Sequence, residues 1–335
     1  MNILYCCDDN YGAYTGISIT SLFENNKDLN EINVYIAGQG ISDKNKARLQ
    51  KTAGNYGRCI TMLDALRFEQ FLRDNNASDY KESKATYYRV FIDKMLPESV
   101  SRVFYIDSDS VVVGSLSDLE SFIFEPDKVC AMKRDPVQAI YKTSIGLKED
   151  DIYYHAGAVL FDLDNWRRLK CSDLLIKEIE AGRADYRLPD QDLISAVLNK
   201  YIQTLDMKYN YITHIPYLGI DIYRAISDAN DDTYYTVHQM QEAMADPVVL
   251  HYVKGFVGAP WEKGNINPFK EEYLKYKEMS LWNDTGETPN RMSKLMIVQR
   301  FLMKALPKKL YIPLHKLYSK QKHSKIIRQE TMSHK

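Results

Sequence analysis

The sequence predicts an α/β protein with a mainly parallel central sheet that is covered by helices on both faces. Short apolar runs alternate with longer segments of helical periodicity, which is the order that strands and crossover helices take in such a sheet. The 335 residues are enough for one large core or two domains, and the hydrophobic share of 45% and charged share of 27% are those of an ordinary globular protein. Disordered and fibrous proteins are thereby excluded.

The first part of the chain shows this alternation most clearly. Apolar or alternating runs predict strands over residues 2–7, 32–37 and 59–63. Helical patterns predict helices over residues 14–25, 44–53 and 68–73, the second of them capped by Ser42. Because folds of this kind bind ligands at the carboxyl ends of their strands, the residues that follow each strand are the candidates for function.

Two acids follow the apolar run at residues 102–106. Asp107 and Asp109 lie two residues apart, so in an extended segment their carboxylates project to the same side and can converge on one cation. A hard divalent ion held by one or two carboxylates usually keeps open positions for phosphate oxygens, which suggests chemistry on a nucleotide diphosphate. The alternative is a polar turn at a strand end, where Asp and Ser108 are common.

The end of the first predicted strand has the features of a nucleoside pocket. The small side chain of Cys6 lets a flat base approach closely, Asp8 and Asn10 can accept hydrogen bonds from a base or a ribose, and Tyr11 can stack. Capping of the following helix by the same acids is the alternative. A glycine-rich phosphate loop is absent from the sequence, so a metal and basic side chains would have to neutralise a diphosphate.

Three later segments add candidate groups. His155 lies in the segment 154–163, in which small residues come ahead of a predicted buried strand. Asp190 and Gln191 lie at the start of a predicted helix, where acids also favour the helix dipole. His251 ends a predicted strand over residues 248–252. The loop that follows it carries Lys254, Gly255 and Gly258, and such a loop can wrap phosphates.

The C-terminal part differs in charge from the rest. Residues 289–329 hold eleven Lys or Arg and no acid, whereas residues 1–288 hold 32 basic and 44 acidic side chains. The polar stretch 283–290 reads as a linker, which divides the chain into a body at 1–282 and a tail at 291–335. If residues 291–310 are helical, one side is apolar and the other basic, although Ile297 and Phe301 fall on the basic side.

This tail pattern predicts attachment to an anionic membrane surface, with a helix packed on the body as the alternative. The basic charge continues through Lys309, Lys316, Lys320, Lys322, Lys325 and Arg328. No recognised nucleic-acid module accompanies this charge, so no nucleic-acid partner is expected. Five scattered cysteines, the lack of a charged leader and the lack of a spanning apolar stretch predict a cytoplasmic protein attached peripherally to the inner face of the cell membrane.

Taken in order, these segments resemble retaining glycosyltransferase family 8, which includes bacterial lipooligosaccharide galactosyl- and glucosyltransferases and glycogenin. The resemblance covers about residues 1–282 and is carried by the segments 8–11, 85–89, 105–109, 156–157, 190–192 and 251–261. It implies a GT-A fold, a UDP-sugar donor, a cell-surface glycan or lipid-linked acceptor, and manganese, with magnesium as the alternative. The sugar would be a hexose, glucose or galactose.

The resemblance also implies a role for individual residues. Asp107, Asp109 and His251 would hold the metal. The nucleotide would contact Cys6, Asp8, Asn10, Asp107, Ser108, Lys254, Gly255 and Gly258, and the donor sugar would contact Arg89, Asp135, His155, Asp190 and Gln191. Asp190 and Gln191 would carry the chemistry, and because an amide is a poor nucleophile, a front-side ion-pair route is favoured over a covalent intermediate.

Two departures from the family pattern bear on the donor. His155 stands where many members have Asn, and Ala259 stands where a Lys commonly precedes the last Pro-Trp, a charge that Lys254 could replace. His155 could titrate near neutral pH or contact a different hydroxyl, or it could simply support the loop. A catalytically silent nucleotide-sugar binder and a metal-dependent phosphoryl-transfer or hydrolytic enzyme are the alternative functions.

Overall fold

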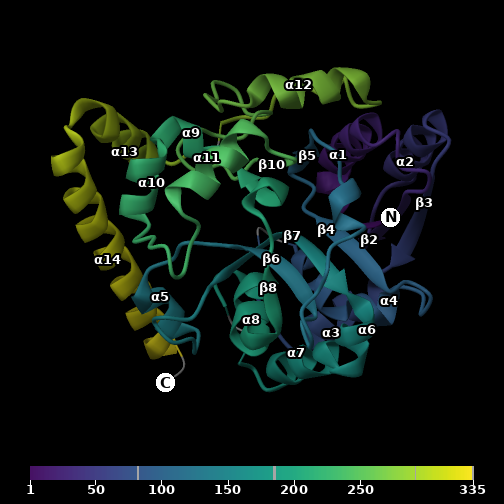
Figure 1. Cartoon of the computed structure of the whole chain (residues 1–335), viewed down its shortest axis with the longest axis horizontal. Helices are drawn as coiled ribbons and strands as arrows, with labels where there is room; N and C mark the ends of the chain where they lie inside the picture. Colours follow the sequence, from purple (N-terminus) through teal and green to yellow (C-terminus); the bar gives the residue numbers. More distant parts are fainter. Residues whose placement is uncertain (81–82, 184–185, 291, 334–335) are drawn as a thin grey trace.

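The computed structural model describes residues 1–80, 83–183, 186–290 and 292–333, with side chains described up to residue 321. A seven-stranded sheet forms its centre (Figure 1) in the order β3-β2-β1-β4-β7-β6-β8. Its strands are β1 (Asn2–Cys7), β2 (Asn33–Gly38), β3 (Cys59–Asp64), β4 (Arg102–Ile106), β6 (Cys130–Arg134), β7 (Tyr154–Asp162) and β8 (Ile202–Thr204). Only β7 runs antiparallel to its neighbours, β4 and β6, so the expected mainly parallel α/β sheet is confirmed.

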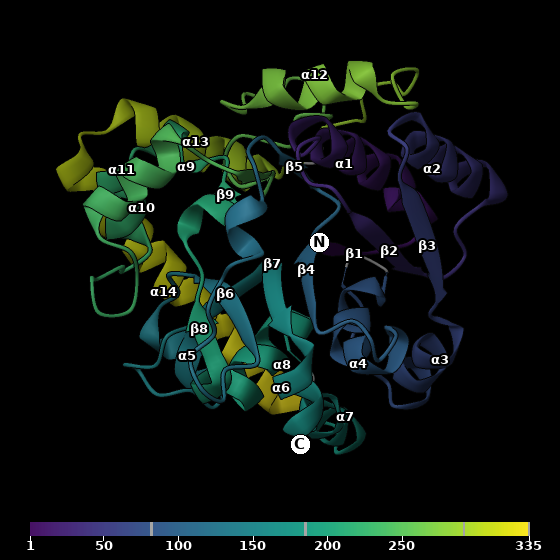
Figure 2. The same cartoon turned by 45° about the vertical axis from the view of Figure 1, so that its right-hand side comes forward.

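Helices cover both faces of this sheet (Figure 2). One face carries α1 (Gly12–Asn25), α2 (Asp43–Asn55) and α12 (Lys270–Met279). The other carries α3 (Leu66–Asp74), α4 (Ile92–Met95), α6 (Leu163–Arg168), α7 (Cys171–Glu180) and α8 (Pro189–Leu198). Each layer buries its own apolar cluster, so the strands between them are buried on both sides.

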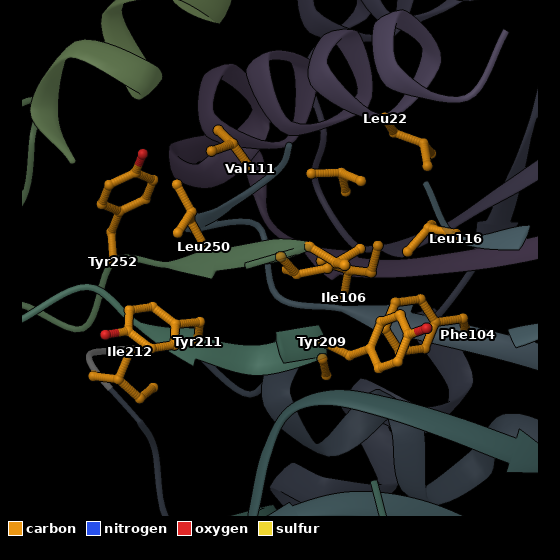
Figure 3. Close-up of a cluster of buried hydrophobic side chains, with 14 of the residues drawn as sticks. Leu22, Phe104, Ile106, Val111, Leu116, Tyr209, Tyr211, Ile212, Leu250 and Tyr252 are labelled. Atoms are coloured by element: carbon orange, nitrogen blue, oxygen red, sulfur yellow. The ribbon is translucent and has the colours of Figure 1, made fainter. Parts of the chain in front are cut away.

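A second sheet of three short strands extends the carboxyl edge of the first. It consists of β5 (Ser110–Val112), β10 (Val249–His251) and β9 (Tyr211–Ile212), with β10 in the middle. Figure 3 shows Val111, Leu250, Tyr211 and Ile106 from these strands and β4 packed into one buried cluster beneath α1. This sheet places the end of β10 beside the turn that follows β4.

The sequence-predicted elements agree with most of these bounds. The strands at residues 2–7 and 102–106 are confirmed, and Ser42 caps α2 by accepting a hydrogen bond from the Asn45 backbone. The helix expected over residues 14–25 begins two residues earlier, at Gly12. Trp282, which follows α12, packs against Gly16 of α1, and a Cβ on Gly16 would lie 1.9 Å from the Trp282 ring. This close contact holds the segment after α12 against α1.

The C-terminal segment is two helices rather than one. α13 (Lys294–Ala305) ends before Pro307, because a residue preceding proline disfavours the α conformation, and α14 (Lys308–Ser333) follows. The expected linker is fastened to the body, since the Thr288 backbone bonds to Trp261 and Lys263. Remaining connections include α5 (Ala139–Ser144), α9 (Ile215–Leu218), α10 (Ile220–Ile226) and α11 (Val237–Ala245).

The expected single apolar side of the tail is divided between the body and solvent. Leu302, Met303 and Leu306 pack against the core, and Tyr311 is buried. The apolar residues that stay exposed are Leu295, Ile297, Val298, Phe301, Leu310, Leu314 and Leu317. The basic residues Lys322, Lys325 and Arg328 lie outside the described side chains. None of the described helices is both long and apolar enough to span a bilayer.

Candidate active site

The two predicted acids and the predicted histidine meet at the edge between the two sheets. Asp107 and Asp109 come from the turn after β4, and His251 ends β10, which pairs with β5 so that His251 faces Ser110. One ligand atom from each of the three residues lies within 4.8 Å of the other two. His251 Nε2 is 3.1 Å from Asp109 Oδ1 and 3.7 Å from Asp107 Oδ2. The predicted metal-ligand set is therefore assembled in space.

The electrostatics of this cluster suit a cation. Burial disfavours the imidazolium, but Asp109, with help from Asp107, outweighs burial and raises the pKa of His251. The two carboxylates thus already draw a proton onto the ring at the point where a divalent ion would bind. Two carboxylates and one imidazole are a donor set for a divalent ion that leaves coordination positions open.

Gly157 is required for this arrangement. It lies in β7, and a Cβ built on it would be 2.3 Å from Cε1 and 2.4 Å from Nδ1 of His251. Any side chain would therefore displace the histidine ring. The need for close approach, rather than backbone freedom, explains a glycine in the middle of a buried strand.

Arg89 links the acid pair to Asp190. It is almost fully buried and lies in a 3-10 segment at Ala85–Phe91. Its guanidinium donates to Asp107 Oδ1 at 3.0 Å and lies 3.1 Å from Asp190 Oδ2. Burial raises the pKa of Asp190 to about 6, although Arg89 opposes this effect. The arginine therefore fixes two carboxylates on the cavity wall.

Gln191 is held at both ends of its amide. Its Oε1 accepts from the Ala156 backbone N–H at 3.0 Å, and its Nε2 donates to the Tyr153 hydroxyl at 2.9 Å. Asp192 is completely buried and accepts hydrogen bonds from the hydroxyls of Tyr141 and Tyr153. Asp192 therefore supports the first turn of α8, while Asp190 and Gln191 face the cavity.

Two adjoining cavities meet at the acid pair. The smaller, about 80 Å³, is lined by Cys6, Asp8, Tyr11 and Ser108 among others, and the larger, about 400 Å³, by Asp135, His155, Gln191 and His251 among others. Both are also lined by Tyr80, Thr86, Asp107 and Asp109. A ligand with two parts could thus occupy both cavities, with its middle beside the candidate metal ligands.

Most of the predicted site residues line these cavities, but two do not. Asn10 is exposed on the first short helix, and Gly258 is buried within the loop that follows β10, with φ +79°, so neither lines either cavity. Asp8 has both of its predicted features, because it lines the small cavity and also accepts from the Tyr11 backbone as a cap. Ser108 accepts a hydrogen bond from Thr15 at 2.8 Å.

His155 and Lys254 both line the large cavity, but the protonation of the first and the contacts of the second differ from what the sequence suggested. Burial lowers the pKa of His155 well below its ordinary value, so the possibility that it titrates near neutral pH is wrong, and it lines the cavity as a neutral ring. Lys254 also lines the cavity, but its ammonium is 2.7 Å from the buried carboxylate of Glu262. It would have to leave Glu262 to contact a phosphate.

Sequence reasoning missed several supporting residues. Lys133 is fully buried and 3.2 Å from Asp135, which it holds on the cavity wall. Asn210 is fully buried between two histidine rings, and Tyr153 holds Gln191. The alternation of β6 could have placed Lys133 on a buried face, but nothing local in the sequence distinguishes Asn210 or Tyr153.

The comparison with protein families identifies the class of the protein. The glycosyl transferase family 8 profile matches residues 2–264, which include every cavity residue named above. The chain belongs to glycosyltransferase family 8. It is thus a retaining hexosyltransferase, as its motifs predicted, and the tail lies outside the matched region.

Two curated relatives match most of the chain. "General stress protein A" of Bacillus subtilis is 28% identical over 85% of this chain and 96% of its own length. "Lipopolysaccharide 1,2-glucosyltransferase" of Escherichia coli is 26% identical over 85% of this chain and 79% of its own length. The similarity to these relatives therefore extends over most of the body of the protein rather than one motif.

Solved structures give the same fold. The galactosyltransferase LgtC, solved with donor and acceptor sugar analogues, superposes with a TM-score of 0.67 at 21% identity and covers 84% of this chain and 96% of its own. GlyE of Streptococcus pneumoniae superposes with a TM-score of 0.59 at 17% identity, over 87% of this chain and 66% of its own. The predicted GT-A fold is confirmed.

Proposed function

We propose that this family 8 enzyme transfers glucose or galactose from a UDP-sugar to a cell-surface glycan or lipid-linked acceptor, in a reaction that depends on a divalent metal. The observation that carries the proposal is the pair of adjoining cavities joined at Asp107 and Asp109. A nucleotide sugar has the same division, with a flat base at one end, a sugar at the other and two phosphates between them. The phosphates would lie beside His251 and the acid pair.

The metal would be held by Asp107, Asp109 and His251, whose donor atoms fit a divalent ion. Manganese is the proposed ion, with magnesium as the alternative. Bound there, it would act as a Lewis acid that neutralises charge developing on the leaving diphosphate.

The protein residues would position the donor from both ends. Cys6 and Asp8 would receive the uracil and ribose in the small cavity. Arg89 and Asp190 would orient the sugar in the large cavity, where Asp190 can accept a hydrogen bond from a hydroxyl. These contacts would expose the anomeric carbon to an acceptor entering from the open side.

Retention of the configuration at the anomeric carbon is best explained by attack of the acceptor on the same face of the sugar from which the diphosphate leaves. The amide of Gln191 is neutral and bonded at both ends, so it is a poor nucleophile but can orient its dipole toward a developing sugar cation. Asp190 is ionised above pH about 6, but it is paired with Arg89. Neither arrangement favours a covalent sugar intermediate, which supports the front-side route.

We propose that the acceptor is part of a surface glycan, as in the lipopolysaccharide 1,2-glucosyltransferase relative. Attachment of the tail to the inner face of the membrane would bring the enzyme to a lipid-linked acceptor. The exposed apolar residues Phe301, Leu314 and Leu317 and the basic residues beside them support this location.

A donor hydrolysis screen tests the function. The full-length protein is incubated with UDP-glucose, UDP-galactose and their N-acetyl forms, with and without Mn²⁺, and free UDP is measured. Release of UDP from one hexose donor, only with metal and lost in Asp109→Asn, is the expected result. The anomer of the released sugar, read by NMR at early times, reports retention. Binding of UDP-sugars without any release would identify the catalytically silent alternative.

A further inference from the structure

Asn210 occupies a rigid position beside the candidate metal ligands. It is fully buried at the end of the short helix Met207–Asn210 and immediately precedes β9. The rings of its neighbours Tyr209 and Tyr211 are anchored in the buried cluster (Figure 3). Because β9 pairs with β10, Asn210 is held next to His251 by the backbone of the small sheet.

The side-chain amide of Asn210 bonds to two histidines. Its Oδ1 is 2.9 Å from His251 Nδ1, and its Nδ2 is 3.2 Å from His155 Nδ1. The Gly157 backbone N–H also points at His155 Nδ1, at 3.0 Å. The two imidazole rings lie edge to face with their centroids 5.2 Å apart.

These contacts determine which nitrogen carries each proton. A backbone N–H can only donate, so His155 Nδ1 must accept from Gly157, and a neutral ring then carries its proton on Nε2. The same acceptor takes the second hydrogen bond from the NH₂ end of Asn210, which turns the amide oxygen toward His251. The Nδ1 of His251 must therefore donate.

The two rings have opposite chemical uses. In the metal-free protein Nε2 of His251 donates to the carboxylate of Asp109. A metal bound there would replace that proton on Nε2, while Nδ1–H stays bonded to Asn210. His155 lines the large cavity with Nδ1 already occupied, so Nε2–H is the group left to donate to a ligand. The amide of Asn210 thus keeps the proton of His251 Nδ1 away from the metal-facing nitrogen and helps to leave Nε2–H of His155 as a donor.

We propose that Asn210 is a positioning residue that couples the two rings. Together with the Gly157 N–H it keeps Nδ1 of His155 an acceptor, and its oxygen holds the proton on Nδ1 of His251. His251 can then bind the metal through Nε2, and His155 donates to an oxygen of the donor sugar. The sugar part rests on the function proposed above, because it assigns the large cavity to the donor. Histidine at position 155 makes this donor specific for an acceptor oxygen, whereas an Asn in its place could either donate or accept. His155 is therefore a specificity-determining residue for the sugar.

The first test requires no substitution. Long-range ¹H–¹⁵N NMR of the histidine rings in the metal-free protein distinguishes the two neutral tautomers, and loss of a signal in His155→Asn assigns it. His155 is expected in the Nε2–H form near neutral pH. An Nδ1–H or doubly protonated His155 would overturn the proposal.

Two variants then separate the functions of the amide. Asn210→Asp keeps an oxygen to accept from His251 but places a carboxylate oxygen, which can only accept, opposite Nδ1 of His155. This carboxylate should draw a proton onto Nδ1 in competition with the Gly157 N–H, so His155 should leave the Nε2–H form. The Mn²⁺ affinity, measured by calorimetry without nucleotide, should change less than about threefold. Asn210→Ala loses both contacts, so its Mn²⁺ affinity should fall about 10- to 100-fold. The matched control is Asn26, which is equally buried and bonds to backbone groups far from the site.

The controls Asn26→Asp and Asn26→Ala should leave both the His155 tautomer and Mn²⁺ affinity unchanged. Equal Mn²⁺ affinity in Asn210→Ala and Asn26→Ala, or an unchanged His155 tautomer in Asn210→Asp, would refute the positioning role. In Asn210→Asp, affinity for the hexose donor should fall toward that for UDP. If wild-type protein binds no UDP-sugar at all, the proposed function fails, while the tautomer and Mn²⁺ measurements still decide the role of Asn210.

Discussion

Replacement of Gly157 by alanine should separate metal binding from folding. The new Cβ would lie 2.3 Å from Cε1 of His251, whereas ordinary contact begins at 3.4 Å, so the ring must retreat by about 1 Å. Metal–ligand distances tolerate only about 0.2 Å, so the ring nitrogen would leave the coordination sphere. Affinity for Mn²⁺ should therefore fall at least about 10- to 100-fold, which corresponds to about 1.4–2.8 kcal/mol.

The same substitution should leave the protein folded. Overpacking by one methyl group costs about 1–3 kcal/mol, less than the roughly 5–15 kcal/mol by which folded domains are stable, and the displaced ring can move toward the open cavity. Calorimetry gives the Mn²⁺ affinity of Gly157→Ala, and urea denaturation gives its free energy of unfolding. A folded Gly157→Ala protein that binds Mn²⁺ as tightly as wild type would show that His251 is not a metal ligand.

Gly54 provides the matched glycine control. It lies in α2, and a Cβ there would meet no atom within 4 Å. Gly54→Ala should raise the free energy of unfolding by about 0.5–1 kcal/mol, because alanine is preferred in helices. Its Mn²⁺ affinity should equal that of wild type, so any loss seen only in Gly157→Ala is specific to the site.

Three further outcomes follow from the same structure. Replacing both Asp107 and Asp109 by Ala should abolish the enhancement of UDP binding by Mn²⁺, and calorimetry showing equal UDP affinity with and without Mn²⁺ in wild type would contradict metal dependence. Between pH about 4 and 6 the folded protein binds a proton at Asp190 that the unfolded chain releases, so this residue's contribution to stability falls as pH rises. Urea denaturation should therefore show Asp190→Asn gaining up to about 3 kcal/mol relative to wild type across that range, and a constant difference would contradict the raised pKa. The triple change of Phe301, Leu314 and Leu317 to Ser should reduce sedimentation with anionic lipid vesicles without lowering the melting temperature, because these side chains are exposed, and unchanged sedimentation would refute membrane attachment through the tail.

The fold and the acid pair could be predicted because their signals are local, whereas His251 was added to the candidate metal ligands only through the resemblance to family 8. Strand periodicity located residues 2–7 and 102–106, and the spacing of Asp107 and Asp109 placed both acids on one side. Residues that act across the fold leave no such signal. Asn210 lies between two histidines only because a small sheet joins β9 to β10, and the tail pattern could not show which apolar side chains pack inward.

The charges around the large cavity support the proposed need for a metal when a diphosphate binds. Among the described residues that line it, the cationic side chains are already engaged: Arg89 with Asp107 and Asp190, Lys254 with Glu262, and His251 with Asp109. His155 is neutral, and Lys133 behind the wall is paired with Asp135. A diphosphate that entered this site without a metal would therefore meet carboxylates, and each cationic side chain among the described residues that line the cavity would already be paired with an acid. A divalent ion bound first would reverse the local charge, so metal binding should precede donor binding.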